Sequence, residues 1–378
     1  MALLDTYLKQ MLENDGSDLH LSVGSVPKIR ASARITPLSD EIITASRMAE
    51  LLQSITRPQR WEDYLQNHDL DLAYEISGLA RFRGSFFYNH WGQAAVFRQI
   101  PAEILSFDTL KLPEVLKDVC AYKEGLVLVT GPTGSGKSTT LAAMMDYINE
   151  NFQKHIITVE DPIEFVHPKK KSVIVHREVG EHSHSFSNAL RGAMRADPDI
   201  VLVGEMRELE TIKLALSCAS MGMLVFGTLH TTGAAKTVDR IVNAFPMQQQ
   251  ETIRIQLSTV LQCVISQILV KRLPKGRVAI HDIMMMTPSI SALIRDNKTF
   301  RIPSDQQTGQ KYGMVTLDDG LFNFYGKGVV SREDCVNKAQ DYTGMLMRLK
   351  EWDEQQAALQ AEQLAAVGAH ATQPPPAG

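Results

Sequence analysis

The sequence predicts an α/β protein in which a small N-terminal domain precedes a larger domain built around a parallel sheet. From Gly125 onward, apolar strands alternate with helical stretches, and the strands read GLVLVT, HIITVE, DIVLVGE and MLVFGTLH. Short strands that are apolar throughout and separated by helices are typical of a parallel sheet covered on both faces. The chain of 378 residues is long enough for two or three domains with cores of their own.

The N-terminal segment shows a different pattern. Apolar residues at helical spacing in 2–14 predict a helix, and further helices are expected near 44–66. Alternation of apolar and polar residues in 17–23 and 69–76 predicts strands, and the aromatic-rich stretch 81–91 predicts another. We expect these elements to form a small α/β domain.

The boundaries follow from changes in composition along the chain. Residues 93–116 contain several prolines and are expected to cross from the first domain to the second. After Gln248 the pattern is mostly helical, with one strand near 277–286. We predict an N-terminal domain over 1–100, a linker over 101–116, a core domain over 117–285, a helical region over 286–353, and an Ala/Gln/Pro-rich tail over 354–378 that is expected to be disordered.

Composition excludes several classes of protein. The net charge of −4 gives no support for a nucleic-acid-binding surface. The four cysteines are scattered, which favours reduced thiols over a disulfide framework or a thiolate zinc site. Because the chain shows no run of eighteen apolar residues and starts with a charged segment, we expect a cytoplasmic protein without direct membrane insertion.

The stretch GPTGSGKS at 131–138 matches the phosphate-binding pattern G-x-x-x-x-G-K-[ST], and it stands between a predicted strand and a predicted helix. Glycines in such a loop let backbone N–H groups point at phosphates, and the helix that follows adds the positive end of its dipole. Lys137 is expected to reach the β- and γ-phosphates of ATP, and Ser138 to bind Mg²⁺. The predicted nucleotide-binding residues are Gly131, Pro132, Thr133, Gly134, Ser135, Gly136, Lys137, Ser138 and Thr139.

Acidic residues follow two of the apolar strands. Glu160, Asp161 and Glu164 surround the end of HIITVE, and Glu205 follows DIVLVG. Ligands of an open α/β sheet bind at the carboxyl ends of its strands, where hydrolysis needs groups that orient water and hold a metal. We favour functional roles for Glu164 and Glu205, whereas turn and cap chemistry is the alternative for Glu160 and Asp161.

A third strand ends in a histidine. MLVFGTLHTTGA presents Thr228 and His230 at the same edge of the predicted sheet. We expect His230 to sense the γ-phosphate. The other histidine-containing stretch, HREVGEHSHSF at 176–186, fits no zinc-binding spacing and is expected to be an exposed loop.

These segments together resemble the secretion ATPase superfamily, which powers type II secretion and type IV pili. In that family TVEDPIEF, DPDIVLVGEMR and GTLHT correspond to the Asp box, the Walker B motif and the His box. GSDLHLSVGSVPKIR, GLARFRGSFFYNHWG and GMVTLDDGLFNFYGKGVVSREDCV are similar to the PilT/PilU branch of pilus retraction motors. The lack of paired cysteines and of a long extra N-terminal domain favours retraction over pilus assembly or type II secretion.

The resemblance implies a PAS-like α/β N-terminal domain, a RecA-like P-loop ATPase domain and a helical C-terminal region. It implies that Glu164 prepares the attacking water, with Glu160 as a weaker candidate, and that Glu205 acts on Mg²⁺ through water. It also implies that arginines of the N-terminal domain reach the nucleotide when the two domains close; these are Arg81, Arg83 and Arg98. For any one of these arginines, a surface ion pair is a nearly equally good interpretation.

The implied assembly is a homohexamer that hydrolyses ATP at the inner face of the bacterial inner membrane and drives pilus retraction. Its implied partners are the inner-membrane platform protein and a paralogous retraction ATPase. The stretch 289–299, SISALIRDNKT, departs from the motif of the main retraction motor, so an accessory motor stays an alternative. More remote alternatives are a nucleic-acid translocase, a small-molecule kinase and a nucleotide-gated binding module.

Overall fold

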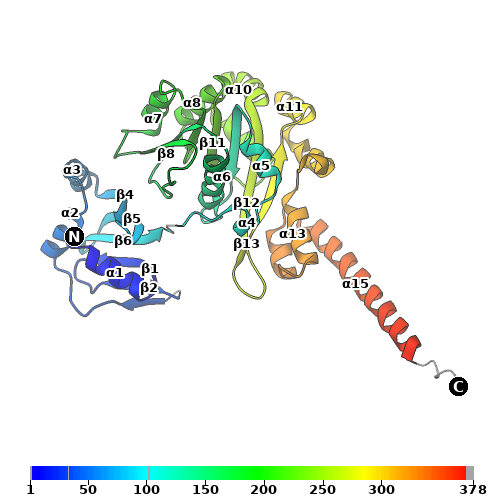
Figure 1. Cartoon of the computed structure of the whole chain (residues 1–378), viewed down its shortest axis with the longest axis horizontal. Helices are drawn as coiled ribbons and strands as arrows, with labels where there is room; N and C mark the ends of the chain where they lie inside the picture. The colour runs from blue at the N-terminus through cyan, green and yellow to red at the C-terminus, as the bar shows by residue number, and fades with distance from the viewer. Residues whose placement is uncertain (1, 33, 101–102, 372–378) are drawn as a thin grey trace. The chain divides into compact units, whose positions relative to one another are not determined.

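The structure is a computed structural model, and it describes residues 2–32, 34–100 and 103–371. Two compact units are present. The first comprises Met1–Val127, Ser138–Leu229 and Val260–Gln262, and the second comprises Leu128–Lys137, His230–Thr259 and Cys263–Gly378. The predicted α/β fold class is confirmed, because the chain forms two sheets, and helices precede, separate or follow their strands (Figure 1).

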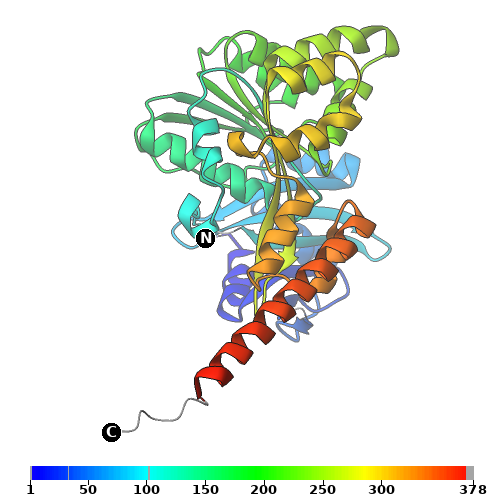
Figure 2. The same cartoon turned by 90° about the vertical axis from the view of Figure 1, so that its right-hand side faces the viewer.

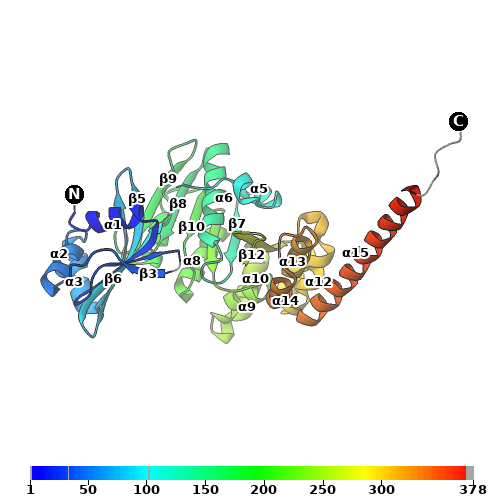
Figure 3. The same cartoon turned by 90° about the horizontal axis from the view of Figure 1, so that it is seen from below.

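The N-terminal part of the first unit is a six-stranded antiparallel sheet in the order β3-β2-β1-β6-β5-β4. Three helices accompany the strands (Figure 3). The elements are α1 (Asp5–Glu13), β1 (Gly16–Ser22), β2 (Lys28–Ala31), β3 (Arg34–Pro37), α2 (Ala45–Gln53), α3 (Pro58–Asn67), β4 (Asp69–Ile76), β5 (Ala80–Asn89) and β6 (Gly92–Ile100). The predicted strands at 17–23, 69–76 and 81–91 are confirmed as β1, β4 and β5.

Alternation along the strands divides the N-terminal sheet into an apolar face and a charged face. Phe82, Phe86 and Phe97 are fully buried in one cluster with apolar residues of α1, α2 and α3. Arg83 and Arg98 are exposed and lie opposite each other in the β5–β6 register, so they share the other face. The strand period therefore places the arginines on the open face of this sheet.

Our expectation that residues 93–116 cross between domains is wrong for residues 93–100. Residues 92–100 form β6, which pairs with both β1 and β5 in the middle of the sheet. Its residues from Gln93 to Ala95 are all buried, which hides the alternation that marks a half-buried strand. Two short helices follow, α4 (Phe107–Leu110) and α5 (Val115–Cys120).

The second sheet has seven strands in the order β13-β12-β7-β11-β10-β8-β9. Its members are β7 (Gly125–Thr130), β8 (His155–Glu160), β9 (Val173–Glu178), β10 (Ile200–Val203), β11 (Leu224–Leu229), β12 (Leu261–Lys271) and β13 (Arg277–Met285). Strand β10 pairs in parallel with β8 and β11, and every residue of β10 and β11 is buried. The helices between the strands are α6 (Lys137–Asn151), α7 (Phe186–Ala193), α8 (Leu209–Ser220), α9 (Ala234–Asn243) and α10 (Met247–Val260).

Two strands of this sheet contradict our predictions. The region after Gln248 was expected to be helical before 277, but Leu261–Lys271 is a long strand, β12, that pairs antiparallel with β13. Most of its residues are buried, so apolar and polar residues do not alternate along it, and periodicity cannot distinguish such a strand from a buried helix. Likewise, His176 belongs to strand β9 and is half-buried, so the expected exposed loop 176–186 begins inside the sheet.

The C-terminal part of the second unit is helical. It contains α11 (Pro288–Arg295), α12 (Ile302–Thr308), α13 (Leu317–Gly326), α14 (Arg332–Lys338) and α15 (Tyr342–Ala371), with short 3-10 turns at Thr299–Arg301 and Gln310–Tyr312. Figure 2 shows α15 extending well beyond α13 and α14. Residues 354–371 of the predicted tail thus continue this helix, and 372–378 lie outside the described residues.

Two further properties concern the helices and the cysteines. In the part of the chain that the structure describes, no helix has the length and apolar character needed to cross a membrane. The cysteines Cys120, Cys218, Cys263 and Cys335 are all buried thiols. Burial raises the pKa of the Cys218 and Cys335 thiols to about 11, so both stay protonated at neutral pH.

Candidate nucleotide site

The phosphate loop leaves the buried strand β7 and enters α6, as the sequence predicts. Gly131, Gly134 and Gly136 all have positive φ, at 142°, 76° and 89°, so the loop needs residues without a side chain at these points. Helix α6 begins at Lys137. This succession of left-handed glycines before a helix aims backbone N–H groups into one concave loop.

The ammonium group of Lys137 lies at the mouth of its own loop. It donates to the carbonyl oxygen of Gly131 at 2.8 Å and to that of Pro132 at 3.1 Å. Both acceptors belong to the phosphate loop, so the Lys137 side chain folds back over this loop. A polyphosphate oxygen is a stronger acceptor for an ammonium group than a neutral carbonyl. The position is therefore suited to a cation that binds phosphate.

Gln267 of β12 supports the loop, and no local sequence pattern indicates this role. Its amide nitrogen donates to the carbonyl oxygen of Ser135 at 2.7 Å. A Cβ atom on Gly131 would come within 2.1 Å of the Gln267 carbonyl oxygen, and one on Gly136 within 2.8 Å of the amide nitrogen. Gly131 is thus required by the close approach of the β12 backbone as well as by its own conformation, and Gly136 by its positive φ.

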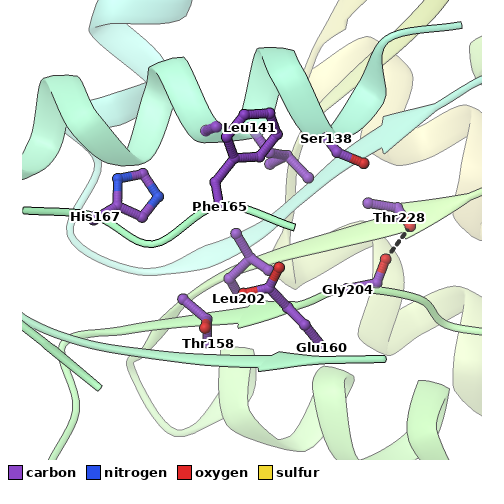
Figure 4. A pocket seen from close by; sticks show the side chains of 10 residues that line it. Ser138, Leu141, Thr158, Glu160, Phe165, His167, Leu202, Gly204 and Thr228 are labelled. Carbon is purple, nitrogen blue, oxygen red and sulfur yellow. Dashed lines mark hydrogen bonds between the residues drawn. The ribbon is translucent and has the colours of Figure 1, made fainter. Parts of the chain in front are cut away.

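A small cavity of about 40 Å³ opens where α6 begins (Figure 4). Helix α6 contributes Ser138 and Leu141, and the carboxyl ends of three parallel strands contribute Glu160, Gly204 and Thr228. The backbones pack closely at Gly204, where a Cβ atom would lie 3.1 Å from the Val159 carbonyl oxygen. The sheet therefore brings a hydroxyl group and a carboxylate to one cavity, at the edge that the sequence predicts.

The two Asp-box glutamates occupy different surroundings. Glu160 lines the cavity with Ser138, accepts from the backbone N–H of Glu164 at 3.5 Å, and lies 3.9 Å from His176 Nδ1. Glu164 lines a separate cavity of about 380 Å³ together with Glu75 and Arg81. Among the described residues, none donates a hydrogen bond to the Glu164 carboxylate. Glu160 is thus held in place, while Glu164 is available to a ligand.

A histidine pair that the sequence did not point to lies beside Glu160. His176 Nε2 accepts from the backbone N–H of His167 at 3.2 Å, so the proton of this ring is on Nδ1, which donates to Thr158 Oγ1 at 3.0 Å. The two imidazole rings stack with centroids 5.7 Å apart. Burial, reinforced by His176, lowers the pKa of His167 to about 4, so His167 is neutral at physiological pH.

Glu205, Thr228 and His230 lie at the ends of the next two strands. Glu205 follows β10, is about one-quarter exposed, and forms an ion pair with Arg207. Thr228 donates to the Gly204 carbonyl oxygen, and its own carbonyl accepts from Met206 at 3.0 Å, which fixes the backbone on both sides of Glu205. His230 follows β11 directly and is exposed.

The three predicted arginines have different partners. Arg81 pairs with Glu75 at 3.1 Å and also donates to the Ile163 carbonyl oxygen of the Asp box at 3.3 Å. Arg83 pairs with Asp71 at 3.8 Å, and Arg98 pairs with Asp18 at 2.7 Å, both within the N-terminal sheet. Of the three, the structure brings Arg81 to the Asp box.

Glu178 holds the same point of the Asp box from the other side. Its carboxylate accepts from the backbone N–H of Ile163 at 3.1 Å. Burial raises the pKa of Glu178 above its ordinary value, although the Ile163 hydrogen bond and the charge of Arg60 oppose this. Arg60 of α3, which the sequence analysis missed, lies 4.0 Å from Glu178 and 3.2 Å from Glu181. These ion pairs join the N-terminal helices to the Asp-box region within the first unit.

The donor chemistry of the cavity fits Mg²⁺. The described residues contain no cluster of three or more histidine, cysteine or acidic side chains that could enclose a metal ion. Mg²⁺ in phosphoryl-transfer sites does not need one, because one or two protein oxygens, phosphate oxygens and water complete its shell. Ser138 and a nearby carboxylate provide oxygen donors of this kind.

Comparison with known proteins identifies the family. Residues 1–275 match the family model described as Type II/IV secretion system protein. The chain belongs to this family. It is an ATPase of the secretion ATPase superfamily, as the resemblance implied.

Similar individual proteins agree with this assignment. The chain is 49% identical over 324 residues to the type IV pilus retractation ATPase PilT of Pseudomonas aeruginosa, covering 86% of this chain and 94% of that protein. It is 34% identical over 351 residues to the type IV pilus ATPase PilU of the same species, covering 93% and 92%. A crystal structure of the pilus retraction motor PilT with bound ADP superposes with a TM-score of 0.83 at 42% identity, covering 90% of this chain and 98% of that one.

Proposed function

We propose that this protein is a motor ATPase that hydrolyses ATP to drive type IV pilus retraction. The observation that supports this most is the 49% identity to a named retraction ATPase over 94% of that protein. Identity to the relative named type IV pilus ATPase PilU is 34%, which favours a motor of the PilT type over one of the PilU type. The phosphate loop and the strand-end carboxylates provide the chemistry that such a motor needs.

Within this proposal, Lys137 and the loop N–H groups bind the phosphates, and the Ser138 hydroxyl and Glu205, acting through water, hold Mg²⁺. The metal would supply positive charge to the β- and γ-phosphates when bound. His230 follows a strand that ends at this edge of the sheet, and we assign it to the γ-phosphate.

We assign the water-preparing role to Glu164 and a positioning role to Glu160. A general base needs a carboxylate that can reach the attacking water. The Glu160 carboxylate already accepts from the Glu164 backbone, whereas the Glu164 carboxylate faces a cavity that Arg81 also lines. The Ile163 N–H donates to the Glu178 carboxylate and Arg81 donates to the Ile163 carbonyl oxygen, so both residues support the turn that carries Glu164.

The proposed working form is a homohexamer that acts on an inner-membrane platform protein at the cytoplasmic face of the membrane. Contacts of the N-terminal arginines that form with ATP and break after hydrolysis would give the two domains a nucleotide-dependent arrangement. A ligand drives motion only through such a difference in its affinity for two conformations. We also propose the domain boundaries 1–100, 101–116, 117–285 and 286–353 for the functional parts of the chain.

Deletion of the gene in its host, with counting of surface pili by electron microscopy, tests the proposed direction of transport. A retraction motor predicts excess surface pili and loss of twitching motility, restored by the intact gene but not by a Lys137→Ala gene. Cells without pili would instead assign the protein to assembly and overturn the proposal.

A further inference from the structure

The segment that carries Glu164 has no regular secondary structure. The structure describes all of residues 161–172, which we call the Asp-box loop, and assigns none of them to a helix or a strand. The backbone N–H groups of such a loop need acceptors other than a helical or sheet ladder. Side chains of β8 and β9 accept from three of them, those of Ile163, Glu164 and His167. The shape of the loop therefore depends on these side chains.

Two acceptors on β9 hold the loop on either side of Glu164. The Glu178 carboxylate accepts from the N–H of Ile163 at 3.1 Å, and His176 Nε2 accepts from the N–H of His167 at 3.2 Å. Ile163 directly precedes Glu164, and His167 follows it three residues later. His176 and Glu178 are two residues apart in β9, so their side chains point to the same face of the sheet. One strand thus fixes the loop before and after the proposed base.

The His176 ring is itself held in place. Because a backbone N–H only donates, Nε2 carries no proton, and Nδ1 donates to Thr158 Oγ1 at 3.0 Å. Thr158 of β8 is the partner of His176 in the parallel register, and the His167 ring stacks on His176 with an interplanar angle of 9°. Thr158 and His167 both line the cavity that Ser138 lines (Figure 4). The His176 side chain is 14% exposed, so little water is available to replace it as an acceptor.

We propose that His176 is a positioning residue that acts with Glu178 to hold Glu164 where its carboxylate can take a proton from the attacking water. The inference rests on the proposed role of Glu164 as the base. Without His176, Asn149 of α6 would still hold the far part of the loop, through the Pro168 carbonyl at 2.7 Å. The loop would therefore stay attached but shift locally. A displacement of about 1 Å at a reacting group can cost about 10²-fold in rate.

His176→Phe in the full-length protein tests this anchor with a small change in shape. The phenyl ring can keep the stacking on His167 but offers no acceptor to its N–H. We expect the rate of single-turnover ATP hydrolysis to fall by about 10-fold or more, while the Kd of ADP stays within about 2-fold because the phosphate loop is untouched. His176→Gln should restore the rate to within about 3-fold of wild type, since its amide carbonyl can accept from His167.

A double substitution separates positioning from a merely structural role. A residue that acts through Glu164 has little further effect once Glu164 has lost its basic group. In the Glu164→Gln protein, His176→Phe should therefore lower the single-turnover rate by less than about 2-fold. His155→Phe is the matched control, because His155 also contacts a backbone group, the Asp197 carbonyl at 3.1 Å, but lies at the start of β8, away from the Asp-box loop. Its rate should stay within about 2-fold of wild type.

Each outcome decides the proposal. A wild-type rate in His176→Phe overturns the positioning role but leaves the motor function intact, and so does a loss that His176→Gln does not restore or that multiplies with the loss in Glu164→Gln. A Glu164→Gln protein as fast as the wild type overturns the proposed base together with this inference. If His176→Phe does not fold, His176→Asn takes its place, because the shorter amide can reach Thr158 but not the His167 N–H. A wild-type rate in that variant overturns the inference.

Discussion

In the N-terminal sheet, charged side chains stand in mid-strand on the face away from the apolar cluster, whereas in β8, β10 and β11 of the second sheet charge is confined to the strand ends. Asp18 lies between Arg30 and Arg98 in the N-terminal sheet, at 3.9 and 2.7 Å. By contrast, β10 and β11 carry no charged residue and are followed by Glu205 and His230. A strand covered on one face tolerates charge along its length, whereas a strand covered on both faces tolerates it only where hydrogen bonds compensate the burial, as that from Gln306 does for Asp282 at 2.9 Å.

The difference predicts where substitutions matter. Charged residues on an exposed face can lose an ion pair at little cost, because water then solvates both groups. Exposed ion pairs contribute about 0–1 kcal/mol to the free energy of unfolding. Polar residues at the ends of buried strands lie close together in a fixed arrangement. A substitution there is therefore expected to remove a group that takes part in ATP hydrolysis, and not merely a surface charge.

Substitution of the proposed base tests the strand-end side of the contrast. Glu164→Gln should lower kcat by about 10²–10⁴-fold, because the amide cannot take a proton from water. Glu160→Gln should cost about 10–100-fold, the value of a hydrogen bond to a charged group. Steady-state ATPase assays of the two purified variants give the ranking. A larger loss in Glu160→Gln would move the base to the cavity that Ser138 lines.

The phosphate loop should be nearly as sensitive. Lys137→Ala is expected to lower kcat by about 10²–10³-fold, because a preorganised positive charge is lost where phosphate charge develops. Lys154→Ala is the matched control, since Lys154 pairs with Asp199 at 2.9 Å near the surface. Steady-state ATPase rates of the two variants and the wild type measure the effect. A Lys137→Ala protein with wild-type turnover would contradict the assignment of this loop.

The arginines test the open face. Arg81→Ala should reduce kcat by about 10-fold or more, because it removes a charged donor to the Asp-box carbonyl, whereas Arg83→Ala should change kcat less than about 3-fold. The two residues lie on the same face of β5, which makes Arg83 a matched control. Equal losses would show that Arg83 also acts on the nucleotide, and that exposed arginines of this sheet are as important for turnover as Arg81.

The smallest expected effect is a pH dependence of stability. Burial raises the pKa of Asp282 to about 6 from 3.8, with Asp318 adding to the shift, although hydrogen bonds from Gln306, Leu317 and Ala234 oppose it. Between about pH 4 and 6 the folded protein therefore binds more protons at this site than the unfolded chain, so the free energy of unfolding falls as pH rises. Asp282→Asn should remove this contribution.

Thermal unfolding at pH 4.5 and pH 6.5 in both proteins measures the effect. The loss of stability on raising the pH should be smaller in Asp282→Asn than in the wild type. Groups such as Asp18 titrate alike in both proteins and cancel in the difference. An identical pH response in the two proteins would place the ionisation of Asp282 outside this range.

The sequence predicted best what is determined by local pattern. The phosphate-loop motif and the buried parallel strands were recognisable because a short stretch of sequence determines each of them. Strand β12 was missed because its burial on both faces removes the alternation that distinguishes a strand from a buried helix. The central strand β6 was missed for the same reason.

The site was predicted in its residue types but not in its arrangement. Glu160 and Glu164 are four residues apart, and the course of the chain through Asp161–Pro162 decides which of them lines the cavity with Ser138. Gln267 and Arg60 act through contacts with segments far away in sequence, so no local pattern marks them. The roles of Glu164, Glu205, His230 and the arginines stay predictions.

The burial of all four cysteines makes this chain a convenient scaffold for spectroscopy. A maleimide dye reacts with an exposed thiolate, and none of the native sulfur atoms offers one under ordinary labelling conditions. A single cysteine introduced on the exposed side of α13, paired with another in the N-terminal sheet, could therefore be labelled without first stripping the native ones. The rearrangements proposed for the ATP cycle would then be visible as changes in energy transfer within an otherwise unmodified polypeptide.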